Sequence, residues 1–143
     1  MKMIVGVADH PSFITGLEDF LNFVSELNVE AVEIKLDKIE MLSYLYSQTP
    51  SRFNKVKKIL DSFDFKYFIH APYIGINLAS LNPNIRRASE KTVAEAVKFA
   101  NEIEAELVVT HVGRLSRDYP QNIIEKSMSN AVTSLKKLRE LAE

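Results

Sequence analysis

Four short apolar segments rich in β-branched residues alternate with longer segments of helical periodicity, and this alternation constrains the fold most. The expected strands are residues 3–8, 31–36, 66–71 and 106–112. The segments between them repeat apolar residues every three or four positions, as on one face of a helix. A strand–helix unit repeated four times predicts parallel strands joined by right-handed crossovers. We therefore expect a single α/β domain over the whole chain, residues 1–143, with no linker.

Proline marks the start of two of the expected helices. Pro50 and Pro83 each suit a first helical turn, where the N–H that proline lacks is not needed. A short helix is also expected over 39–46, and the last helix over about 121–142. On this last helix, the apolar period predicts a buried side made of Ile124, Met128, Ala131, Leu135 and Leu138.

The pattern within the strands separates two architectures, an open sheet with helices on both faces and half of an eight-stranded barrel. In the second strand, Val32, Ile34 and Leu36 face one way, while Glu33 and Lys35 face the other. A sheet covered by helices on both faces should be apolar on both. A polar alternate face instead suits strands that line a barrel mouth. The prediction is a (β/α)4 half of a TIM barrel, since a full barrel needs about 250 residues.

Two of the three histidines close the third and fourth strands. His70 and His111 should lie at matching carboxyl ends, roughly 4.8 Å apart if the strands are neighbours. Two imidazoles at that spacing can share one metal ion. Each could instead be a hydrogen-bonded residue at the start of a loop, and that alternative stays open. Zinc sites need further ligands, for which Glu33, Asp9 and His10 are candidates.

The composition limits the compartment and the partners. The net charge is −1, from 18 basic and 19 acidic residues, so no global positive field collects phosphate backbones. Cysteine is absent, which excludes disulfides and thiolate metal sites. The apolar run at the N-terminus is too short for a signal peptide or a membrane span. We expect a cytoplasmic protein that does not bind membranes.

Two motifs carry a resemblance to a known family. HAPYIGINLAS (70–80) and VVTHVGR (108–114), together with the helical segment between them, resemble the third- and fourth-strand region of the xylose isomerase-like TIM barrels. VEIKLD (32–37) is similar to the second strand of these proteins. The superfamily includes sugar-phosphate isomerases and epimerases, and also endonuclease IV. The resemblance covers essentially the whole chain, and its specific part is about forty-five residues.

The resemblance implies roles for individual residues. His70 and His111 match the histidines that bind zinc in endonuclease IV-like members, so they are the candidate metal ligands. Zinc is the expected ion, with manganese and magnesium as alternatives. Glu33 is the candidate catalytic residue, and Arg114 and Asn77 are the candidate substrate-binding residues. The family's other ligands, and the base of its isomerases, come from later strands that these 143 residues do not contain.

Three functions follow as alternatives. The first is a divalent-metal-dependent sugar or sugar-phosphate isomerase or epimerase, incomplete on its own. The second is an endonuclease IV-like phosphodiesterase acting on abasic DNA, which the balanced charge disfavours. The third is a half-barrel that assembles or binds a ligand without turnover. Whether the chain is an enzyme by itself stays open. Four parallel strands leave two open edges and an uncovered face, so a homodimer that rebuilds a barrel is expected.

Overall fold

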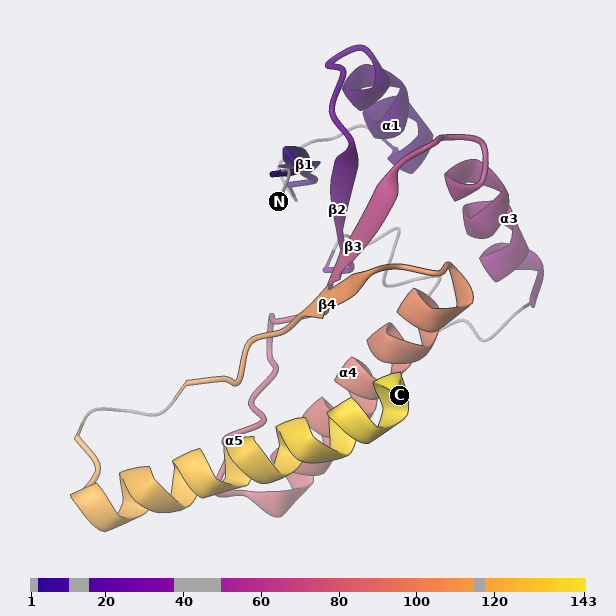
Figure 1. The fold of residues 1–143 in the computed structure, drawn as a ribbon. Helices are drawn as coiled ribbons and strands as arrows, with labels where there is room; N and C mark the ends of the chain where they lie inside the picture. Colours follow the sequence, from indigo (N-terminus) through magenta and orange to yellow (C-terminus); the bar gives the residue numbers. More distant parts are fainter. Residues whose placement is uncertain (1–2, 11–15, 38–49, 115–117) are drawn as a thin grey trace.

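The computed structural model describes residues 3–10, 16–37, 50–114 and 118–143. Four strands in this part of the chain form one parallel sheet in the order β1-β2-β3-β4, as the sequence predicts (Figure 1). The strands are β1 (Gly6–Ala8), β2 (Ala31–Lys35), β3 (Lys66–His70) and β4 (Leu107–Val109). The helices are α1 (Leu17–Ser25), α3 (Pro50–Leu60), α4 (Pro83–Glu102) and α5 (Gln121–Ala142). The helix expected over 39–46 lies outside the described residues.

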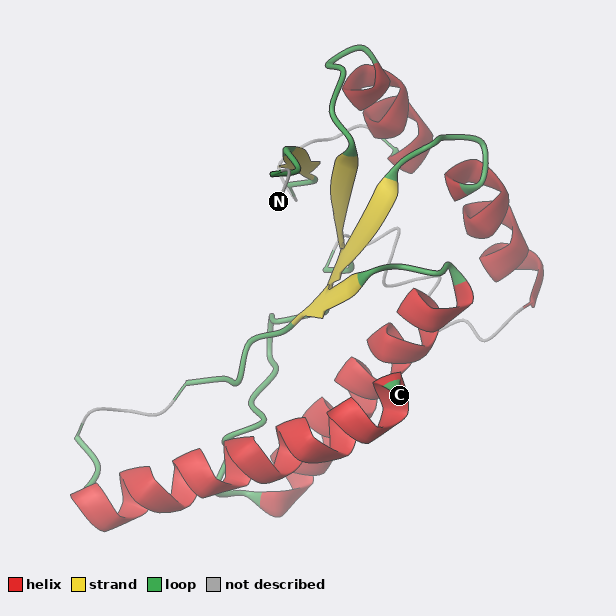
Figure 2. Cartoon of the chain, in the orientation of Figure 1, coloured by secondary structure: helices red, strands yellow, loops and turns green. Residues whose placement is uncertain are grey.

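The described helices gather on one side of the curved sheet, and none of them lies on the other side (Figure 2). Val32 and Ile34, on the predicted apolar face of β2, are fully buried. This face therefore lies under the helices. Ile69 of β3 continues this core at 0% exposure. The alternate residues Glu33 and Lys35 lie on the opposite face and are only partly buried. One packed face and one polar face are the pattern predicted for half of a barrel, which the structure confirms.

A buried tyrosine shows how a polar atom is accommodated within the helix-covered core. The hydroxyl of Tyr67, on β3, donates a hydrogen bond of 2.8 Å to the carbonyl of Leu60 at the end of α3. Burial raises the pKa of Tyr67 to about 12, since the ionised phenolate would lose its hydration there. The hydrogen bond satisfies the hydroxyl, so the ring can pack in the core without leaving a buried donor unpaired.

The open side and both ends of the sheet expose apolar residues, as expected for an incomplete barrel. On β4, Leu107 is 53% exposed. Just before β1, Met3 and Val5 are 85% and 64% exposed. Phe68 and Val109, which the sequence pattern also places on the inner face, are partly buried. Within the described residues, β1 and β4 are the two end strands of the sheet, so these apolar groups lie on its inner face and at its ends.

The buried side of α5 differs from the prediction. Met128 is 64% exposed and Leu135 is 36% exposed, although both were expected inside. Ala131 and Leu138 are buried as predicted, and the helix also buries Ser127 and Ser134, which were not expected inside. Small side chains allow α5 to lie close to the backbone that precedes α4, and the two serines bond to it. An apolar period alone cannot foresee this rotation, because serine reads as a surface residue in such a pattern.

Two serine hydroxyls dock α5 on the loop before α4. The Ser127 hydroxyl donates a hydrogen bond of 2.6 Å to the carbonyl of Ala79. The Ser134 hydroxyl has one proton and shares it between the carbonyl of Leu78, at 3.2 Å, and the carboxylate of Glu90. The carboxylate of Glu90, on α4, lies 2.7 Å from the Ser134 hydroxyl and 3.2 Å from Lys137 Nζ. Desolvation raises the pKa of Glu90, but the hydrogen bonds and charge of these partners outweigh it and lower the pKa overall.

Candidate functional site

The two histidines that the sequence singles out face each other at the carboxyl ends of β3 and β4. His70 is the last residue of β3 and pairs in register with Val109, and His111 follows two positions later. Residues two apart in an extended chain point to the same face, which here is the open, inner face. The Nε2 atoms of His70 and His111 are 3.1 Å apart, and the ring centroids are 5.1 Å apart.

Glu33 approaches the same pair from the other side of His70. Its Oε1 atom lies 2.7 Å from Nδ1 of His70, while His111 lies at Nε2. The two side chains are largely sheltered, with 13% of His70 and 28% of Glu33 exposed. Neighbouring strands hold this contact, because Glu33 of β2 pairs in register with Phe68 of β3. The candidate catalytic carboxylate is therefore engaged with one of the candidate metal ligands.

Tyr73 forms a wall beside both imidazoles, a role that the sequence reasoning missed. Its ring centroid lies 5.6 Å from that of His70, nearly edge-on, and 5.1 Å from that of His111. The Asp37 carboxylate holds this loop by accepting hydrogen bonds from the backbone N–H of Tyr73 at 2.8 Å and of Ile74 at 3.3 Å. The sequence feature that could have indicated this role of Tyr73 is its position, three residues after His70.

Asn77 and Arg114 also come together, through a hydrogen bond to the backbone. The Asn77 Nδ2 atom donates a hydrogen bond of 2.9 Å to the carbonyl of Arg114. The Oδ1 atom of the same amide accepts a hydrogen bond of 3.1 Å from the N–H of Ala79. Gly113 lies against this amide with φ of 102°, and a Cβ there would overlap Asn77. Asn77 thus joins the loops that follow β3 and β4. The Arg114 side chain is exposed at this junction. Substrate binding by either residue stays a prediction.

The other candidate ligands do not complete a metal site by themselves. Asp9 is 1% exposed, and its backbone N–H donates a hydrogen bond of 2.8 Å to the backbone carbonyl of Glu33. His10 is exposed. Within the described residues, no group of three or more His, Cys, Asp or Glu side chains is arranged to hold an ion.

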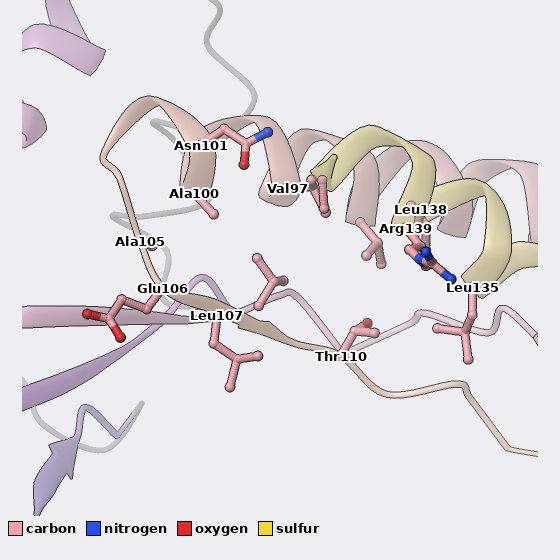
Figure 3. Close-up of a pocket in the computed structure, with 13 residues that line it drawn as sticks. Val97, Ala100, Asn101, Ala105, Glu106, Leu107, Thr110, Leu135, Leu138 and Arg139 are labelled. Carbon is pink, nitrogen blue, oxygen red and sulfur yellow. The ribbon is translucent and has the colours of Figure 1, made fainter. Parts of the chain in front are cut away.

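A separate groove of about 350 Å³ lies between α4, α5 and β4, on the helix side of the sheet (Figure 3). Its lining is mostly apolar and includes Val97, Ala100, Leu107 and Leu135. The hydroxyl of Thr110, next to His111, is buried here and has no hydrogen-bond partner among the described residues.

The described helices include none that is long and apolar enough to cross a membrane.

Comparison with known proteins agrees with this fold. The chain is 24% identical over 143 residues to the uncharacterized protein MJ1311 of Methanocaldococcus jannaschii, which covers all of this chain and 46% of that protein. Among solved structures, a D-tagatose 3-epimerase-like protein superposes with a TM-score of 0.77 at 24% identity, covering 98% of this chain and 49% of that one. Endonuclease IV from Thermus thermophilus superposes with a TM-score of 0.60 at 18% identity, covering 95% and 47%.

The chain spans about half the length of each of these proteins. A family described as xylose isomerase-like TIM barrel matches residues 21–143. Four parallel strands with helices on one side, and coverage of half of each full barrel, identify the architecture as half of a TIM barrel. The chain therefore belongs to the xylose isomerase-like TIM barrel family.

Proposed function

We propose that this chain carries one half of a divalent-metal-dependent sugar or sugar-phosphate isomerase or epimerase. The observation that supports this most is the 3.1 Å separation of the Nε2 atoms of His70 and His111. Two zinc–nitrogen bonds of about 2.05 Å spanning that separation subtend an angle of about 100° at the ion, close to tetrahedral. The pair lies at the carboxyl ends of parallel strands, where barrels of this kind carry their chemistry.

The two nitrogens fit part of a metal site. A catalytic zinc site commonly has three protein ligands and a water molecule, so at least one further ligand is needed. We assign it, and the proton-transferring base, to a second half-barrel facing the inner side of this one. A bound divalent ion would polarise the substrate carbonyl and stabilise an enediolate. His70 and His111 would hold the ion on this side of the barrel.

Residues around the histidines supply the substrate side of the proposal. Tyr73 offers an aromatic wall against which a sugar ring can pack. Arg114, exposed beside the Asn77 junction, suits the phosphate of a sugar phosphate, because a guanidinium binds phosphate through paired hydrogen bonds. The superposed D-tagatose 3-epimerase-like protein supports a sugar as the substrate class.

We further propose that a second copy of the chain packs against this one and rebuilds an eight-stranded barrel. Such a dimer would bring further copies of His70, His111 and Glu33 to the barrel as ligands for an ion, but it would not supply the proton-transferring base, which we assign to a half-barrel of different sequence. In a two-fold dimer, β4 of each copy would pair with β1 of the other, which removes all four open edges. The exposed Leu107 of one copy and the exposed Met3 and Val5 of the other would meet at each junction.

An endonuclease IV-like activity on abasic DNA is the second candidate. The histidine pair favours it, and the superposition with endonuclease IV agrees with the fold. The net charge of −1 opposes it, because a duplex is bound mainly through positive charge.

Elemental analysis of the purified, untreated chain tests the metal. We expect a divalent ion in the wild-type protein and in His10→Ala, and its loss in His70→Ala and His111→Ala. His10 is a matched control, since it is the third histidine and is exposed. Equal metal content in all four proteins, or metal in none, would refute the site.

Activity assays on the metal-loaded protein then separate the reactions. Interconversion of ketose epimers supports the first function, and cleavage of a synthetic abasic duplex supports the second. Bound metal with neither activity would leave a half-barrel that binds a ligand without turnover.

A further inference from the structure

We infer that Glu33 is a positioning residue that sets which nitrogen of His70 carries the proton, and so aims the other nitrogen at the metal. This inference rests on the proposed metal site. A carboxylate only accepts hydrogen bonds, so an imidazole nitrogen 2.7 Å away must be the donor. Nδ1 of neutral His70 is therefore protonated, and its Nε2 keeps a free lone pair. That is the tautomer a metal ion requires at Nε2.

The contact between the two histidines then determines the second ring. The Nε2 atoms of His70 and His111 are within hydrogen-bond distance, and only one of them can donate. Since Nε2 of His70 is the acceptor, His111 must carry its proton on Nε2. The metal-free pair thus holds two different tautomers. Metal binding at both Nε2 atoms requires His111 alone to give up its Nε2 proton, while His70 is already in the binding form.

The strands make this arrangement rigid. Glu33 lies within β2 and is paired on both sides, with Ala8 of β1 and with Phe68 of β3. Its backbone carbonyl also accepts from the N–H of Asp9 at 2.8 Å. The ring of Tyr73 borders His70 on a further side. The Glu33 carboxylate, held in this way, orients the ring of His70. Because it is engaged with His70, it is not available as a base toward the substrate. We therefore assign Glu33 a positioning role.

Nitrogen NMR of the metal-free protein at mildly alkaline pH tests the tautomers without any metal. With ¹⁵N-labelled histidine, we expect the wild type to show His70 protonated on Nδ1 and His111 protonated on Nε2. In Glu33→Ala the His70 ring should become a mixture of tautomers. In Glu33→Gln the neutral amide can donate as well as accept, so the preference should weaken. A wild-type His70 protonated on Nε2, or an unchanged spectrum in Glu33→Ala, would overturn the inference.

Titration with Zn²⁺ or Co²⁺ gives a second readout. Loss of a carboxylate that orients a metal-bound histidine typically lowers metal affinity 10–100-fold. We expect a loss of that size in Glu33→Ala, a smaller one in Glu33→Gln, and none in Glu106→Gln. Glu106 is the matched control, because it pairs with Lys66 at the start of β4, away from the histidines.

The two readouts distinguish the inference from the proposed function. A correct tautomer pattern without metal binding would support the role of Glu33 and refute the metal site. Metal binding that is equally tight in wild type and Glu33→Ala would support the metal site and overturn the role of Glu33.

Discussion

His70 and His111 are forty-one positions apart in the sequence, yet their Nε2 atoms are 3.1 Å apart in the structure. Parallel pairing of β3 with β4 produces this meeting, because it brings the carboxyl ends of both strands to one edge of the sheet. Ile69, the neighbour of His70, points to the other face and is fully buried in the core. Adjacent residues of β3 therefore serve binding and stability separately, and substitutions should separate the two effects.

His111→Ala should leave the metal-free fold nearly as stable as the wild type, within about 0.5 kcal/mol, because His111 is exposed. At a free zinc concentration of about a hundred times its Kd, zinc should raise the free energy of unfolding of the wild type by about 2.7 kcal/mol. Zinc should not stabilise His111→Ala. Ile69→Val should lower the free energy of unfolding by about 0.5–1.5 kcal/mol and keep the zinc effect. Urea unfolding with and without zinc measures both, and an unchanged zinc effect in His111→Ala would contradict the site.

Gly113→Ala should disturb the junction between the loops after β3 and β4. Gly113 has φ of 102°, and a Cβ would overlap the Asn77 amide, so both backbone strain and a clash are added. We expect a loss of more than about 1 kcal/mol in the free energy of unfolding. Gly75→Ala is the control: φ is 75°, but a Cβ there meets nothing within 4 Å, so strain alone acts. Equal losses in the two variants would show that the Asn77 contact is unimportant.

Asp37→Ala should loosen the loop that carries Tyr73. The Asp37 carboxylate accepts hydrogen bonds from the backbone N–H groups of two loop residues. A hydrogen bond to a charged group contributes about 1.5–3 kcal/mol to stability. These two are exposed, so we expect a smaller contribution from each. Amide hydrogen exchange at Tyr73 and Ile74 should become faster. Asp61→Ala, which removes an exposed pair with Lys57, should leave exchange at both amides unchanged. If Asp37→Ala also leaves them unchanged, the loop is held by other contacts.

Acid should weaken the docking of α5 on α4 through Glu90. The folded-state pKa of Glu90 is lower than its ordinary value of 4.5, so its ionised form stabilises the fold. This contribution is present above pH 4.5 and is lost as the pH falls through the lower, folded-state pKa. Glu90→Gln should therefore make stability less dependent on pH in that range. Urea unfolding between neutral and acidic pH measures it.

Another glutamate on α4 provides a control for Glu90. Glu95→Gln, which removes an exposed pair with Lys98 within α4, should change the acid dependence less than Glu90→Gln does. If the two variants follow the same curve, Glu90 does not couple α4 to α5.

Leu107→Lys should disrupt self-association. Leu107 is 53% exposed on the edge strand β4, where the proposed partner strand would bury it, and a buried lysine charge there would be unpaired. Sedimentation at micromolar concentration should show a dimer for the wild type and a smaller species for the variant. Phe23→Lys is the control, since Phe23 is 55% exposed on α1, on the outer side of the sheet. A stable, non-aggregating wild-type monomer would refute the dimer.

Much of the fold could be predicted from the sequence, because it depends on local periodicity. Alternation within β2 correctly predicted that Val32 and Ile34 are buried and that Glu33 faces the other way. The order of strands and helices follows from the repeated unit, and parallel pairing then predicts that His70 and His111 end on one edge. These features need only the backbone geometry of strands and crossovers.

The tertiary structure decided what depends on packing between distant segments. It turned α5 so that Ser127 and Ser134 are buried and Met128 is exposed, since hydrogen bonds to backbone carbonyls outweigh the apolar period there. It also brought the Glu33 carboxylate to Nδ1 of His70 and left Nε2 toward His111. Sequence spacing cannot show which atom of a ring a neighbouring side chain meets, because strand register and rotamers set that contact across 37 positions of chain.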